Sequence, residues 1–114
     1  MAITYFQDTI FQTDSALEAP GVGTALQVAV NNTFNTKDYT LIVTVATINT
    51  NVKVTLEGSI DGTNYGIIIA EKTITANGTT AYNVANIPVR WIRPRFVSEN
   101  GGTAATVVFS VAAS

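Results

Sequence analysis

The feature that most constrains the fold is the alternation of apolar and polar side chains in residues 52–60. The apolar positions are Val52, Val54, Leu56 and Ile60, and the polar positions are Lys53, Thr55, Glu57 and Ser59. Successive side chains of a strand point to opposite faces of its sheet, so a period of two is typical of a strand with one buried and one solvated face. We therefore expect Ile60 in the core and Glu57 in solvent.

The rest of the chain also favours strands. Residues 61–64, with the sequence Asp-Gly-Thr-Asn, are a turn signal that predicts a hairpin. Thr, Val, Ile and Ala are frequent elsewhere, and β-branched side chains suit a pleated surface. We expect further strands at residues 25–30, 39–48, 65–70, 71–75, 80–84, 89–96 and 104–112, separated by breakers that contain Asn, Gly or Pro.

These strands predict one all-β domain over residues 1–114. A chain of 114 residues can bury one core but is too short for two domains. Seven or eight short strands at this spacing predict an antiparallel β-sandwich, jelly-roll-like in its arrangement.

Residues 1–23 fit the pattern less well. Their alternation is poor, and Pro20 and the glycines beside it are typical of a break. Two interpretations stay open: an edge strand of the same sandwich, or an N-terminal arm that reaches a neighbouring subunit. A helical turn at residues 15–18, capped by Asp14 or Ser15, is a further expectation.

The sequence offers little to a catalytic mechanism. It contains no histidine and no cysteine, which excludes the commonest general base, thiol catalysis and most transition-metal sites. Lys37, Lys53 and Lys72 do not neighbour a serine in a recognisable motif. A strand and a turn explain Glu57 and Asp61 better than a catalytic carboxylate pair does. We expect a protein that is no enzyme and binds neither cofactor nor metal.

Charged residues are scarce. They make up 12% of the chain, against roughly 25% in ordinary soluble domains. The net charge of −2 argues against nucleic acid as a partner, because phosphate binding needs clustered Lys and Arg. No apolar run approaches the ~20 residues of a membrane helix, so we expect no membrane partner. So few charges favour a surface that contacts other protein.

The segment from Val89 to Phe96 is the most informative about binding. Alternation divides it into two faces: Arg90, Ile92, Pro94 and Phe96 on one, and Val89, Trp91, Arg93 and Arg95 on the other. Trp and Arg are enriched in binding hot spots, so Trp91, Arg93 and Arg95 are candidates to dock a partner or stack on a sugar. In the alternative interpretation, Trp91 lies in the core and the arginines pair with Glu57 or another strand carboxylate.

Two segments together resemble a known family. Residues 56–65, LEGSIDGTNY, are followed about 25 residues later by residues 89–96, VRWIRPRF, and then by a Gly-rich turn. This pattern, over roughly residues 40–112, resembles small virion structural proteins of tailed bacteriophages, of the capsid decoration or cement type. The resemblance implies a β-sandwich without catalytic residues that binds the major capsid protein and copies of itself.

The expected function is therefore that of a capsid decoration protein, which binds and stabilises the assembled major capsid shell. The N-terminus lacks the basic and apolar regions of a secretory signal, so we expect synthesis in the host cytoplasm and a final location on the capsid surface. The contact residues that we expect are Tyr5, Phe6, Phe11, Trp91, Arg93 and Arg95.

Two alternatives stay open. One is a carbohydrate-binding module of a tail or baseplate, with Trp91 or Tyr65 as a sugar platform. The other is a structural subunit of the tail or neck, which would self-associate into rings or tubes without capsid.

Overall fold

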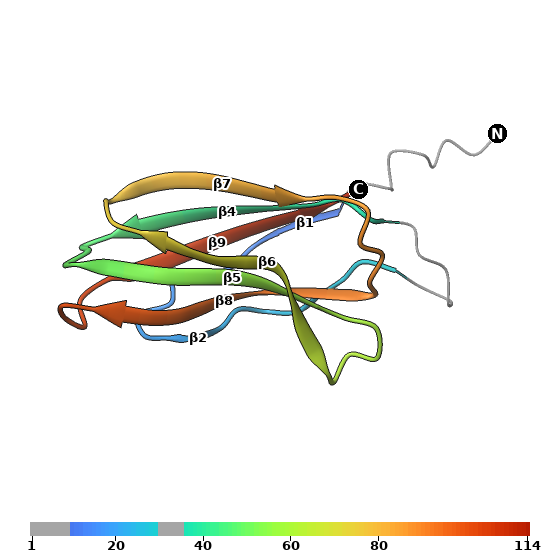
Figure 1. Cartoon of the computed structure of the whole chain (residues 1–114), viewed down its shortest axis with the longest axis horizontal. Coiled ribbons are helices and arrows are strands. Elements are labelled where there is room, and N and C mark those ends of the chain that lie inside the picture. The colour runs from blue at the N-terminus through green and yellow to red at the C-terminus, as the bar shows by residue number, and fades with distance from the viewer. Residues whose placement is uncertain (1–9, 30–35) are drawn as a thin grey trace.

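The computed structural model describes residues 10–29 and 36–114, and its described part consists of strands and loops (Figure 1). The strands are β1 (Ile10–Thr13), β2 (Gly21–Val22), β3 (Leu26–Gln27), β4 (Tyr39–Ala46), β5 (Asn51–Ser59), β6 (Tyr65–Ile74), β7 (Gly78–Val84), β8 (Trp91–Asn100) and β9 (Thr106–Ala113). Within these residues there is no helix that could cross a membrane.

The strands form two antiparallel sheets with jelly-roll connections. One sheet has the order β1-β9-β4-β7, and the other has the order β2-β8-β5-β6, with β3 also paired to β8. Strands from the two ends of the chain pair first, and the pairs then continue inward along the sequence. They are β1 with β9, β2 and β3 with β8, β4 with β7, and β5 with β6. These pairs together form one long hairpin, which folds on itself so that β9 also pairs with β4 and β8 also pairs with β5. The predicted jelly-roll-like β-sandwich is confirmed.

The core lies between the two sheets, and alternation along the strands builds it. Every second residue of β4 and of β9 is buried, and the facing side chains come from β5, β6 and β8. The largest fully buried side chains are Tyr39, Phe96, Phe109, Leu41, Leu56 and Ile92. Each such apolar side chain contributes roughly 1.5–3 kcal/mol by leaving water.

Strand β5 confirms the period of two, but the predictions that Glu57 is in solvent and that Ile60 is in the core were wrong. Val52, Val54 and Leu56 are in the core as expected. Glu57, however, is only 5% exposed, because β5 is a central strand flanked by β6 and β8, whose side chains cover its outer face. Ile60 is 60% exposed rather than buried, because β5 ends at Ser59 and the turn begins there.

The predicted boundary between Ala70 and Glu71 was wrong, because residues 65–74 form the single strand β6. Its register against β5 shifts on both sides of Leu56. Such β-bulges place extra residues in one strand without ending it, so the alternation changes phase while the strand continues.

Residues 10–23 link the two sheets. Strand β1 pairs with β9 in one sheet, and β2 pairs with β8 in the other. The predicted helical turn at residues 15–18 was wrong: Leu17 exchanges two backbone hydrogen bonds with Val107 instead. Of the two interpretations of residues 1–23, the part that concerns residues 1–9 lies outside the described residues, as do Tyr5 and Phe6.

Candidate functional site

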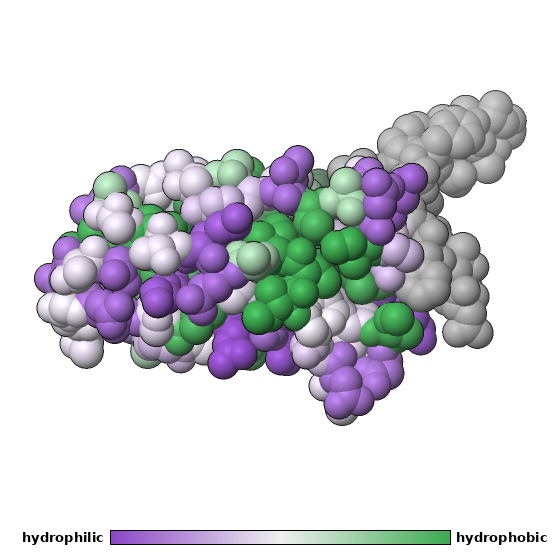
Figure 2. Space-filling model, in the orientation of Figure 1, coloured by the Kyte–Doolittle hydropathy of each residue, from purple (hydrophilic) through white to green (hydrophobic). Residues whose placement is uncertain are grey.

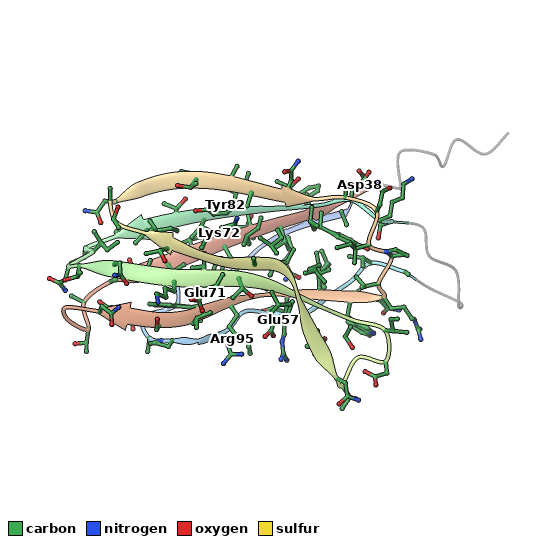
Figure 3. All side chains as sticks on the ribbon, viewed as in Figure 1. Asp38, Glu57, Glu71, Lys72, Tyr82 and Arg95 are labelled. Carbon is green, nitrogen blue, oxygen red and sulfur yellow. The ribbon has the colours of Figure 1, made fainter. Side chains whose placement is uncertain are left out.

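Charged and aromatic side chains gather on the outer face of the sheet β2-β8-β5-β6. Cross-strand pairing sets Glu57 opposite Arg93, and Ser59 opposite both Trp91 and Tyr65. Residues paired in this way share one face of a sheet. We call Glu57, Tyr65, Trp91, Arg93 and Arg95 the arginine cluster. Figure 3 labels Glu57 of β5 and Arg95 of β8, which lie near each other on this sheet.

A buried carboxylate organises this cluster. Arg93 donates from Nε to Oε1 of Glu57 at 2.8 Å, and Arg95 donates from Nη1 to Oε2 at 3.2 Å. The Glu57 side chain is 6% exposed, whereas those of Arg93 and Arg95 are 28% and 48% exposed. Two cations thus share one anion, and the cluster keeps an excess positive charge that faces solvent. Hydrogen bonds between ionised groups are stronger than neutral ones and fix the guanidinium planes.

Tyr65 and the β5–β6 turn hold the other side of the cluster. The guanidinium of Arg93 lies 3.8 Å from the centre of the Tyr65 ring, which is a close cation–π stack. The turn packs against the half-buried Trp91: a Cβ added to Gly62 would lie 3.1 Å from the indole Nε1. Arg93 is therefore held from two sides, by Glu57 and by Tyr65.

Asp61 builds that turn through its hydrogen bonds. Its carboxylate accepts from the backbone N–H groups of Asn64 and Thr63 at 2.7 and 2.8 Å, from the Asn64 side chain, and from the Ser59 hydroxyl. These bonds, the backbone N–H of Asn64 first among them, hold the pKa of Asp61 well below its ordinary value. The carboxylate therefore stabilises the turn, which contains Gly62 and leads into Tyr65.

The structure separates the sequence-predicted site residues into two groups. Trp91, Arg93 and Arg95 share one face of β8, as the alternation predicted, and the arginine–Glu57 pairing of the alternative interpretation is confirmed. The prediction in the same alternative that Trp91 lies in the core was wrong, because the core face of β8 holds Ile92 and Phe96. Phe11 lies on β1 of the other sheet, 78% exposed, so the structure does not bring it to the cluster.

Sequence reasoning missed Tyr65 as the stacking partner of Arg93 and missed the burial of Glu57. Both depend on the register of β5 against β6 and β8. The available signal was the Glu57-to-Tyr65 hairpin itself, since its Asp-Gly turn fixes which residues face one another.

Figure 2 shows the molecule in the same orientation as the ribbon. An apolar patch lies over β6, with hydrophilic side chains beside it. Ile67 of β6 is 61% exposed and pairs with Glu57. The cluster therefore has an exposed apolar neighbour on the same face.

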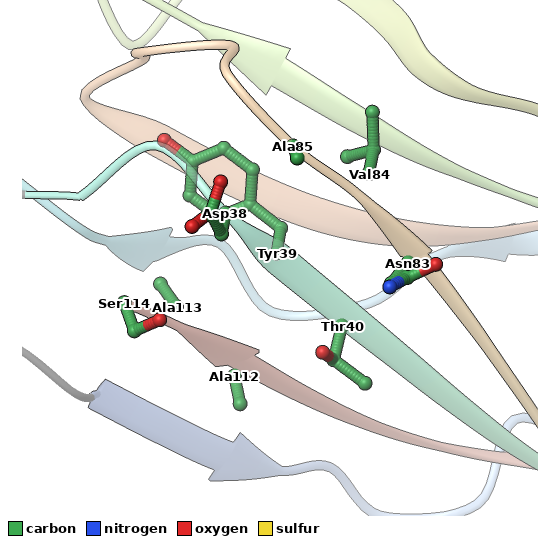
Figure 4. Close-up of a pocket in the computed structure, with 9 residues that line it drawn as sticks. All are labelled: Asp38, Tyr39, Thr40, Asn83, Val84, Ala85, Ala112, Ala113 and Ser114. Carbon is green, nitrogen blue, oxygen red and sulfur yellow. The ribbon is translucent and has the colours of Figure 1, made fainter.

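The hollows of the described surface add no catalytic arrangement. A hollow of about 380 Å³ lies at the ends of β4, β7 and β9 (Figure 4). Asp38 is the single carboxylate side chain among its lining residues, and it accepts a backbone hydrogen bond from Asn86 at 3.1 Å. In the described ranges, no three His, Cys, Asp or Glu side chains gather as metal ligands would.

Comparison with known proteins shows the fold. No family model matches the sequence, and no curated protein is significantly similar to it. Among solved structures, the SPBc2 prophage-derived protein YomS aligns with a TM-score of 0.60 at 11% identity, over 93% of each chain. A carbohydrate-binding module of the CBM4 type gives 0.46 at 9% identity, over 90% of this chain and 94% of that one. The coat protein of Tobacco streak virus gives 0.36 at 12%, over 94% and 86%. At 11% identity, the YomS alignment shows a shared β-sandwich fold.

Proposed function

We propose that this chain is a non-enzymatic structural protein of a phage virion, and specifically a decoration (cement) protein that binds the assembled major capsid shell. The carrying observation is the arginine cluster, in which Arg93 and Arg95 are both fixed on the buried Glu57 while Arg95 remains half exposed. The prophage origin of YomS, which shares the fold over nearly the whole chain, supports a phage role.

Preorganisation makes the cluster suited to protein binding. Arg, Trp and Tyr dominate interface hot spots, and ordering a long side chain on binding costs roughly 0.5–1.5 kcal/mol. Glu57 and Tyr65 order Arg93 before any partner arrives. The excess positive charge of the cluster favours an acidic patch on the capsid protein.

Stabilisation of the shell follows from mass action. A protein that binds the assembled lattice and not the free subunits shifts the equilibrium toward the lattice. Several copies bound to one shell, or one oligomer bound to neighbouring capsomers, convert modest single contacts into firm attachment. The proposed location is the capsid surface, after synthesis in the host cytoplasm.

The test is cosedimentation with empty shells of the major capsid protein of the same phage, and with its unassembled subunits. The wild-type protein is expected to pellet with the shells and not to bind the unassembled subunits. Arg95→Ala is expected to weaken shell binding by about thirty-fold, the effect of a hot-spot residue worth ~2 kcal/mol. Lys37→Ala, an exposed cation outside the cluster, is the matched control. Unchanged binding by a folded Arg95→Ala variant would contradict the proposal.

The carbohydrate-binding alternative is less favoured by the cluster geometry. A sugar platform needs a free aromatic face, but the guanidinium of Arg93 covers one face of Tyr65. The β5–β6 turn packs on Trp91. Binding to a glycan array would revive this alternative, and rings or tubes formed without shells would favour a tail or neck subunit.

A further inference from the structure

The outer face of the sheet β1-β9-β4-β7 carries no charged side chain among its described residues. Register defines its members, because residues opposite one another share a face. They are Phe11 and Thr13 of β1, Thr106, Val108, Ser110 and Ala112 of β9, Thr40, Ile42, Thr44 and Ala46 of β4, and Thr79, Ala81 and Asn83 of β7. We call this set the neutral face.

The hydroxyl groups of the neutral face are partly satisfied within it. Thr13 and Ser110 share a hydrogen bond between their side-chain oxygens at 2.9 Å, and Thr44 and Thr79 share another at 2.9 Å. A polar group costs free energy on burial when it loses its partner. These four hydroxyls keep that bond if the face is covered, which lowers the desolvation penalty of covering it.

A projecting aromatic side chain and a hollow lie next to each other on this face. Phe11 is 78% exposed. Beside it is a hollow of about 150 Å³, lined by Phe11, Thr13, Thr40, Ile42, Ser110 and Ala112 among others. An apolar cavity of ~150 Å³ is large enough to take a benzene ring. A projecting side chain beside a hollow can make one surface self-complementary, as a two-fold contact between identical copies requires.

The size and the charge of the face also fit a second copy. Neighbouring strands lie ~4.8 Å apart and each residue adds ~3.3 Å, so strands of four, eight, eight and seven residues give about 430 Å² per copy. Two copies would then bury about 860 Å², which is below the size of a standard interface and fits a weak, reversible dimer. A charged partner would lose the solvation of its charge against this face without gaining an ion pair, whereas a second neutral face has no charge to desolvate.

We propose that the neutral face binds the neutral face of a second copy about a two-fold axis, with Phe11 of each copy in the hollow of the other. The proposal deepens, and rests on, the part of the proposed function that concerns copies of the same chain. In such a dimer the two arginine clusters lie on opposite outer surfaces, free to bind two neighbouring capsomers.

The test is sedimentation equilibrium of the full chain over a range of concentrations, without shells. The wild-type protein is expected to dimerise reversibly. Phe11→Ala should weaken dimerisation at least about ten-fold, in keeping with loss of a buried aromatic anchor, and Thr44→Lys should abolish it by burying a charge. Ile67→Ala is the matched control, because Ile67 is 61% exposed on the other sheet.

Circular dichroism and thermal unfolding keep the test interpretable, since Phe11 and Thr44 are exposed and their variants should fold. A monomer at every concentration would overturn the proposal. A trimer, or a dimer that both Phe11→Ala and Thr44→Lys leave intact, would overturn it too. Shell binding by a strict monomer would refute this inference and leave the decoration function standing, whereas a dimer that never binds shells would do the reverse.

Discussion

The two outer faces of the sandwich differ in chemistry although the same jelly roll builds both. On the sheet β2-β8-β5-β6, the cross-strand pairs include a buried carboxylate, two arginines and a stacked tyrosine. On the sheet β1-β9-β4-β7, they are Thr, Ser, Ala, Val and Ile side chains, with Phe11 and Asn83 on the edge strands. The first face has directional, charged groups that favour a partner of opposite charge, whereas the second has no charged side chain and carries Phe11 beside a hollow, which suits a copy of itself.

The largest expected effect separates the buried ion pair of the arginine cluster from an exposed pair on the same sheet. Glu57→Gln keeps the shape of the side chain and leaves two guanidinium groups without their anion. We expect a loss of about 2 kcal/mol in the free energy of unfolding, below the ~3–5 kcal/mol of a fully buried pair because the arginines can still reach water. Urea denaturation measures it.

The matched control for that change is Glu71→Gln. Glu71 pairs with Lys53 at 3.7 Å, and both side chains are about two-fifths exposed. Removing an exposed pair should cost less than about 1 kcal/mol. Equal losses for the two variants would mean that Glu57 does not organise the cluster.

The next effect concerns the turn that supports the cluster. Gly62 has a φ of +80° and lies against the Trp91 indole, so Gly62→Ala should cost roughly 1–2 kcal/mol from its left-handed backbone alone. Gly66→Ala is the control, since nothing lies within 4 Å of its added Cβ. The two melting curves should separate clearly, and Gly62→Ala should also weaken shell binding; coincident curves would show that the turn is not held as described.

Added salt should weaken shell binding more than it weakens dimerisation, by a smaller factor than the substitutions above. Between about 0.1 M and about 1 M salt the screening length falls from ~10 Å to ~3 Å. Shell binding through Arg93 and Arg95 should weaken several-fold, whereas dimerisation through the neutral face should hardly change. Titrations of both equilibria across this range provide the measurement, and a dimer as salt-sensitive as the shell complex would break the distinction.

The smallest effect is expected on the neutral face itself. Replacing both Thr44 and Thr79 by Val keeps the shape of the side chains and removes both partners of one hydrogen bond. The free energy of unfolding should change by less than about 0.5 kcal/mol. Dimerisation should strengthen, because more apolar surface is buried; a large loss of stability would show that the hydroxyl pair holds the two strands together.

Local sequence patterns predicted what depends on local geometry. The alternation from Val52 to Leu56 placed the core face of β5, the Asp61 turn placed the hairpin, and the alternation in β8 placed Trp91, Arg93 and Arg95 together. These features follow from the period of two and from turn chemistry, which neighbouring residues determine.

What could not be predicted depends on pairing between distant strands. The burial of Glu57 requires β8 and β6 on either side of it, with Arg93 and Arg95 in register. The continuity of β6 depends on bulges, which hide a strand from a periodicity argument. The neutral face needs four strands from both ends of the chain, so none of its segments shows it alone.

The most direct test of the two-face account is one cosedimentation series with empty shells, run on the wild-type protein, Arg95→Ala and Phe11→Ala. The account predicts that Arg95→Ala binds shells about thirty-fold more weakly than the wild-type protein does. It predicts that Phe11→Ala still binds each site but with weaker overall attachment, because a monomer lacks the second cluster. The assignment of the two faces would be contradicted if Phe11→Ala no longer bound shells while Arg95→Ala bound them as well as the wild-type protein does.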